Sequence, residues 1–177
     1  MQNKFSYLLF SCLLMSLASA AQVSSTDNQP SEAITYKPIQ KNKPVYGVFE
    51  GRPPCQEIAR QLKVNVNQDC NKLKWRLFLF QDNKGQPTTY LLFGSFYREE
   101  SREGKWKISK GSKTDPDAIV YELDSGQPGK TFYLLKGDDN VIFILDENKA
   151  LRVGNEDFSY TLNRVKLVQR DSSELKR

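Results

Sequence analysis

The chain has 177 residues, a formal net charge of +5 at pH 7 and no histidine. Catalytic devices that need an imidazole, such as Ser-His-Asp and Cys-His sites, are therefore excluded, although carboxylate-only and lysine-based chemistry are not. The mild positive charge favours solubility and a weak attraction to anionic surfaces. From this inventory we expect no enzyme, no cofactor and no nucleic-acid partner.

The first 20 residues have the pattern of a secretory signal peptide. Lys4 supplies the positive start, residues 7–17 are an apolar run, and Ala18-Ser19-Ala20 is an A-x-A cleavage site. The apolar run is shorter than the roughly 20 residues that a membrane span requires. We expect cleavage near Ala20, a periplasmic or secreted protein, and no integral membrane segment afterwards. The alternative is a lipoprotein with Cys12 as the lipidated residue, although apolar residues then follow the cysteine where a polar tether is expected.

Two polar segments flank the rest of the chain. Residues 21–44 contain three prolines and few large apolar side chains, which predicts a flexible or partly ordered N-terminal segment. Residues 168–177 predict a charged, frayed C-terminal tail. The single domain between them covers residues 45–167, which is long enough to bury a core.

This domain has a β pattern throughout. Residues 104–110 alternate, with Trp106 and Ile108 on one face and lysines on the other. Gly94 predicts a bend or bulge, and the apolar phase slips after Leu162, which predicts another bulge. Turn sequences rich in Gly, Asp and Asn separate the expected strands, which are 46–51, 62–66, 73–80, 88–97, 104–110, 118–123, 131–137, 140–146 and 158–167.

No stretch shows a convincing helical period. Residues 55–62 allow one helical turn through Ile58 and Leu62, but they merge at once into the strand predicted for 62–66. An up-and-down chain of hairpins hides its edges best by closing on itself. We therefore predict an all-β fold, a small antiparallel β-barrel of about 8 strands.

Aromatic side chains are plentiful for a chain of this size. We expect them to fill the barrel interior, with a hollow barrel that holds one ligand as the alternative. The residues concerned are Tyr90, Phe93, Phe96, Trp106, Tyr121, Phe132, Phe143 and Tyr160.

Cys55 and Cys70 are the cysteines that remain once the leader is removed. Two cysteines in an exported chain usually pair, so we expect a disulfide between them, worth roughly 3 kcal/mol for a loop of this size. A two-cysteine Cu(I) site is the alternative, and a catalytic thiol is disfavoured because no histidine is present to activate it. We expect no metal site.

Charged side chains gather in turns and in one long stretch. The acidic turns lack the alternating spacing of a calcium loop, so we expect solvated turns at Asp115, Asp117, Asp138, Asp139, Asp146 and Glu147. Residues 98–113 predict a solvated strand face, with a docking surface for an acidic partner or anionic lipid as the alternative. Its basic residues are Arg98, Arg102, Lys105, Lys107, Lys110 and Lys113.

Three segments resemble the N-terminal domain of the NlpE family of copper-resistance lipoproteins. They are "YGVFEGRPPC" (46–55), "GKW" (104–106) and "FYLLKGDDNVIFILD" (132–146). The resemblance covers about residues 45–166 and implies a small lipocalin-like barrel in the bacterial envelope, with roles in copper handling and in signalling envelope stress. The opening cysteine of the family belongs to a C-x-x-C pair, whereas here Cys55 matches the first position and Ile58 occupies the second.

These patterns together predict a protein that acts by binding. The main hypothesis, which the resemblance implies, is an envelope-stress or copper-related sensor with a protein partner in the envelope. The alternatives are a lipocalin-like carrier of a small apolar ligand and an inhibitor of an envelope-directed enzyme.

Overall fold

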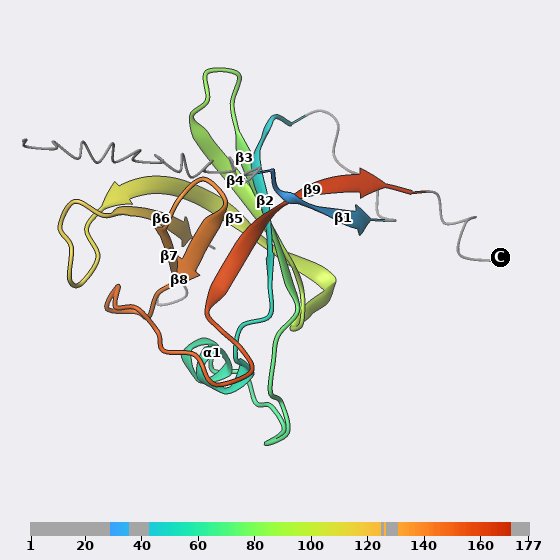
Figure 1. Cartoon of the computed structure of the whole chain (residues 1–177), viewed down its shortest axis with the longest axis vertical. Coiled ribbons are helices and arrows are strands. Elements are labelled where there is room, and N and C mark those ends of the chain that lie inside the picture. Colours follow the sequence, from blue (N-terminus) through green and yellow to red (C-terminus); the bar gives the residue numbers. More distant parts are fainter. Residues whose placement is uncertain (1–28, 36–42, 125, 127–130, 171–177) are drawn as a thin grey trace, which may run out of the picture.

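The computed structural model describes residues 29–35, 43–124, 126 and 131–170, which form a β-barrel with one added strand and one short helix (Figure 1). The elements are β1 (Ser31–Thr35), β2 (Val45–Gly51), α1 (Cys55–Leu62), β3 (Trp75–Gln81), β4 (Pro87–Gly94), β5 (Tyr97–Lys110), β6 (Ile119–Asp124), β7 (Phe132–Lys136), β8 (Val141–Ile144) and β9 (Thr161–Gln169). The predicted signal peptide, Cys12 and the tail from residue 171 lie outside the described residues.

The strands β2 to β9 close into a barrel. Each pairs antiparallel with the next along the chain, and β9 pairs with β8 on one side and β2 on the other. Closure gives the backbone groups at both sheet edges a partner, which is the physical reason for expecting a barrel from a chain of hairpins. The prediction of an all-β barrel of about 8 strands is confirmed.

The strand β1 lies outside this closed barrel. After residue 164, β9 leaves the barrel and its residues 165–169 pair in parallel with residues 31–35 (Figure 1). The slip in apolar phase after Leu162 marks this change of partner, because no register shift occurs in the described pairings of β9. Part of the predicted flexible N-terminal segment is therefore an ordered strand.

The helix α1 covers one end of the barrel (Figure 1). Its buried face has the i, i+3, i+4, i+7 spacing of an amphipathic helix and consists of Cys55, Ile58, Ala59 and Leu62. Lys63 ends the helix in a left-handed conformation, and the N–H groups of Lys63 and Val64 bond carbonyls of the last turn. The strand predicted for 62–66 is wrong, since Leu62 ends α1 and residues 63–66 form a turn and a loop. The helix was not predicted because eight residues make only about two turns, too few for a helical period to stand out in the sequence.

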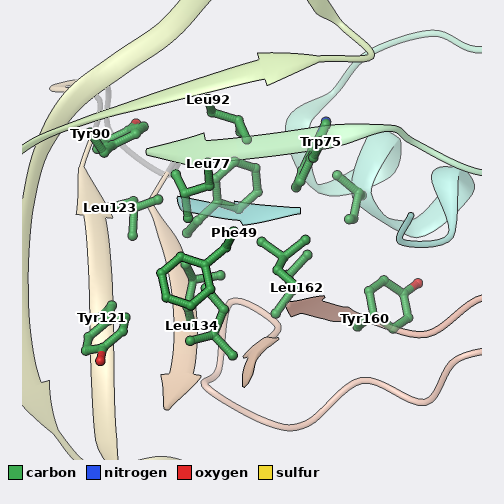
Figure 2. Packing of buried hydrophobic residues seen from close by; sticks show 14 of the residues in the cluster. Phe49, Trp75, Leu77, Tyr90, Leu92, Tyr121, Leu123, Leu134, Tyr160 and Leu162 are labelled. Carbon is green, nitrogen blue, oxygen red and sulfur yellow. The ribbon is translucent and has the colours of Figure 1, made fainter. Parts of the chain in front are cut away.

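Large side chains fill the barrel interior (Figure 2). Phe49, Leu77 and Leu162 converge on its centre, while Trp75 and Tyr160 lie towards the end that α1 covers. Of the eight aromatics expected inside, those that are buried are Tyr90, Trp106, Tyr121, Phe132 and Tyr160. Phe96 packs partly buried against the core, but Phe93 and Phe143 lie on the outer face, in phase with the outward positions of β4 and β8.

Arg102 corrects the prediction of a solvated face over residues 98–113. The other basic residues of that stretch are exposed, but Arg102 is only 9% exposed and its side chain turns inward. Its guanidinium lies 4.4 Å from the ring centroid of Phe132, and Nε donates a hydrogen bond to Tyr90 Oη at 3.1 Å. Burial works against its charge, but hydrogen bonds to Tyr90 and Tyr97 raise the pKa of Arg102 above its usual value. The alternation that turns Trp106 inward also applies to Arg102, four residues earlier.

Candidate binding surface

A groove of about 950 Å³ runs along the outer wall of the barrel. We call the part that includes residues of β1 its upper part, which is lined by Ile34, Thr35, Glu50, Arg76, Phe78 and Phe93. The lower part lies where β2 ends and where β3 and β5 begin, and is lined by Arg52, Lys74, Tyr97, Arg98, Asp157 and Phe158. We call this surface the outer groove. It exists because strand alternation turns one set of side chains into the core and leaves the next set outside.

The strand registers align the upper part of the outer groove. Asn163, Glu50, Arg76 and Phe93 face one another in sequence across β9, β2, β3 and β4. Arg76 forms an ion pair with Glu50 through Nε, and its Nη2 donates to the carbonyl oxygen of Ile34 at 3.2 Å. Arg76 therefore ties β1 to the barrel wall at the edge of the groove.

Aromatic rings form the apolar part of the same wall. The ring centroids of Phe78 and Phe93 lie 5.7 Å apart in an edge-to-face arrangement, and Phe78 stacks on Phe80 at 6.1 Å. Such pairs are favourable beyond the area they bury. The sequence carried a signal for this wall, because residues 73–80 are apolar on both faces in their second half. If the outer face of this strand were simply solvated, phenylalanines would not be needed at its outward positions.

The lower part of the outer groove is rich in positive charge. Arg52, Lys74 and Arg98 are exposed, and their side chains make no hydrogen bond or ion pair with the described residues. Asp157 and Phe158, from the connection between β8 and β9, lie at the same end. The amine of Lys72 lies 5.0 Å from the ring centroid of Phe158. Among the residues that line this part, three cations, Arg52, Lys74 and Arg98, thus accompany one carboxylate, that of Asp157.

Gly94 fixes the β4–β5 turn against β3. Its φ is +117°, and a Cβ at this position would lie 1.7 Å from the carbonyl oxygen of Lys74. Ser95 reinforces the contact, because its Oγ accepts from the Lys74 N–H at 2.9 Å and its N–H donates to the Lys74 carbonyl at 3.1 Å. The expected irregularity at Gly94 is present, but the single strand expected over 88–97 is wrong. The chain turns there, and this turn brings Arg98 into the groove with Lys74.

Cys55 and Cys70 form the expected disulfide, with their Cα atoms 5.7 Å apart. The bridge joins the first residue of α1 to the loop that leads into β3. The Nε2 atom of Gln56 donates to the carbonyls of Asn67, Gln68 and Cys70 at 2.9–3.2 Å, which holds the same loop on the helix. The bridge and these bonds together fix the end cap of the barrel.

The residues present do not fit the two-cysteine Cu(I) site that was the alternative to the disulfide. Cu(I) prefers thiolate, thioether and imidazole ligands. Both thiols of the domain are paired in the bridge, the chain has no histidine, and its methionines are Met1 and Met15, within the predicted leader. Across the described ranges, no three His, Cys, Asp or Glu side chains gather as a metal site.

The acidic turns bind their own backbone. In each, an aspartate Oδ1 accepts a hydrogen bond from the N–H two residues later, as in Asx turns. The pairs are Asp115 with Asp117, Asp138 with Asn140 and Asp146 with Asn148. This role explains these aspartates without a ligand.

Glu122 lies at the centre of a second polar cluster, on the outer face of β6. Its carboxylate accepts hydrogen bonds from Lys149 Nζ at 2.9 Å and Ser109 Oγ at 2.8 Å, and pairs with Lys107 Nζ at 2.9 Å. Partial burial raises the pKa of Glu122, but the hydrogen bonds from Lys149, Lys107 and Ser109 outweigh it and lower the pKa from 4.5 to about 2. The cluster ties the loop that follows β8 to the barrel wall.

The substitution Glu122→Gln is expected to lower the free energy of unfolding at pH 7 by about 2 kcal/mol, after allowance for solvent screening. Because the folded-state pKa is depressed, this stabilisation is present above pH 4.5 and is lost as the pH falls towards 2. Urea unfolding of both proteins at pH 7, 4 and 2.5 measures the difference. The exposed carboxylate of Glu103 provides the control, since Glu103→Gln is expected to have little effect at any of these values. A Glu122→Gln difference that stays constant down to pH 2.5 contradicts the assignment.

Comparison with models of protein families, with curated proteins and with solved structures found no match. No helix in the described part of the chain has the length and apolar character needed to cross a membrane. The resemblance to the NlpE family therefore rests on the three sequence segments that carry it and stays a prediction.

Proposed function

We propose that this chain is an exported binding protein of the bacterial envelope, and that a partner protein docks on its outer groove. One contrast carries the proposal. The barrel interior is filled by its own side chains, whereas the outer groove, of about 950 Å³, is on the outside of the wall. Ligand sites generally combine a concave shape, aromatic area and a few polar groups, and the outer groove has all three.

Two further observations support export and an envelope role. A disulfide is typical of proteins in oxidising compartments, and the first 20 residues have the pattern of a secretory leader. The NlpE resemblance adds an expectation of envelope-stress sensing, which a docking surface suits. Copper handling is left out of the proposal because the described residues offer no suitable set of ligands.

Photocrosslinking in the producing bacterium tests the proposal. A benzoylphenylalanine in place of Phe78 puts the reactive group in the outer groove. The matched control is the same residue in place of Phe143, which is also a partly exposed phenylalanine on the outer face, but on β8. We expect an adduct of discrete mass from the Phe78 position and none from the Phe143 position.

Two results would overturn the proposal. One is the same adduct pattern from both positions, or none from either. The other is one-to-one binding of the apolar dye N-phenylnaphthylamine that is blocked by a larger interior side chain, as in Leu134→Phe. That result favours the carrier hypothesis.

A further inference from the structure

The charges of the outer groove indicate the chemistry of its partner, and this inference rests on the proposed function above. The side chains of Arg52, Lys74 and Arg98 make no hydrogen bond or ion pair with the described residues, whereas that of the neighbouring Arg76 is paired with Glu50. Like charges held close together repel, so a cluster of this kind costs stability unless something offsets it. An anionic partner is the simplest compensation.

The strand registers bring these three cations to one place. Gly51 faces Trp75 across β2 and β3, so Arg52 and Lys74, the next residues outward, leave the two strands at the same level. Gly94 faces both Trp75 and Tyr97, which puts the start of β5 level with the start of β3, with the end of β4 between them. The contact of the Gly94 backbone with Lys74 fixes that arrangement. The cluster therefore lies where β2 ends and where β3 and β5 begin.

Apolar surface lies directly alongside the positive charge. Phe78 and Phe93 line the upper part of the outer groove, and Tyr97 and Phe158 line the lower part with the cations. A flat anionic bilayer would meet the cations first and leave aromatic side chains within a concave wall unused. A narrow polypeptide that carries both carboxylates and apolar side chains uses both parts of the groove.

We infer that the outer groove binds an acidic segment of the partner protein. Carboxylates of that segment pair with Arg52, Lys74 and Arg98, and its apolar side chains pack on Phe78 and Phe93. Asp157 faces the same end of the groove, but one carboxylate among three cations leaves the field positive. Charges of this kind contribute most to the rate of association and to the choice of partner.

Selection from a random 12-residue peptide display library against the full chain tests the inference, followed by Kd measurements on fluorescein-labelled selected peptides. We expect the selected peptides to be enriched in Asp and Glu together with aromatic or aliphatic residues, and to bind more weakly as salt is raised. The triple variant R52E/K74E/R98E is expected to weaken their binding by at least about tenfold, since it replaces attraction with repulsion at three contacts.

The control variant K84E/K105E/K113E makes the same change in net charge at exposed lysines outside the outer groove. We expect its Kd to stay within about twofold of the wild-type value at physiological salt, where distant charges are screened. Circular dichroism establishes that both triple variants are folded. If R52E/K74E/R98E is not, the single variants K74E and R98E replace it, each at an exposed side chain.

Two outcomes would overturn the inference. In the first, the selected peptides show no excess of acidic residues, or they bind R52E/K74E/R98E as well as the wild type. In the second, no peptide is selected and vesicles of phosphatidylglycerol bind the wild type but not that variant, which assigns the cations to a lipid surface. An adduct from the Phe78 position alongside the first outcome leaves the proposed function standing and removes only the acidic partner.

Discussion

The substitution Gly94→Ala is expected to lower the free energy of unfolding by about 3–5 kcal/mol. Two costs add at this position. A φ of +117° is strained for any residue with a side chain, and the new Cβ would lie 1.7 Å from the Lys74 carbonyl oxygen. Because that oxygen belongs to the backbone that leads directly into β3, it cannot move away as a flexible side chain would. The β4–β5 turn must separate from the wall, and Arg98 moves with it.

The control for this prediction is Gly85→Ala in the turn between β3 and β4. Gly85 also has a positive φ, +77°, but nothing lies within 4 Å of a Cβ placed there. This variant carries the conformational cost alone, about 1 kcal/mol. Urea unfolding of the two variants separates strain from contact. Equal losses would show that the approach of the turn to β3 contributes nothing.

The barrel could be predicted because its determinants are local. Alternation of apolar and polar residues fixes which side chains of each strand face inward, and short turns between such strands leave few topologies other than a closed meander. The pairing of Cys55 with Cys70 followed from elimination, since an exported domain with two cysteines usually joins them. Arg102 was predicted to be solvated because it is charged. The alternation of the strand, fixed by the inward-facing Trp106, already indicated that the Arg102 side chain is buried.

The parts that escaped prediction depend on contacts between distant segments. Residues 31–35 become a strand only because residues 165–169 leave the barrel and accept them in parallel. The outer groove needs β1, which this pairing holds in place, together with side chains from β2, β3 and β4. The apolar outer positions of residues 73–80 were a visible signal that this wall is special, but they do not indicate which segment lies over it.

Removal of the disulfide in the double variant Cys55→Ala and Cys70→Ala is expected to lower the free energy of unfolding by about 3 kcal/mol. The bridge spans 15 positions and therefore restricts the unfolded chain. Cys55 is also fully buried, so the loss of its sulfur leaves a small void beneath α1. Wild-type protein reduced with dithiothreitol keeps both sulfur atoms and is the matched control. Reduced protein that is as stable as oxidised protein would contradict the assignment.

Amide hydrogen exchange shows which elements of the fold the disulfide stabilises. If the bridge only restricted the unfolded chain, its removal would speed exchange equally in α1 and in the central strands. We expect α1 to exchange faster than β6 and β7 in the double variant. Without the bridge, the cap is held by its apolar face, by the hydrogen bonds of Gln56 to the loop before β3, and by Glu57, which accepts from Tyr160 Oη at 2.7 Å and pairs with Arg152 at 3.3 Å. These polar contacts are weaker than a covalent bond, so α1 can open while the closed sheet remains intact. Uniform acceleration in α1, β6 and β7 would contradict local opening and would place the whole effect in the unfolded state.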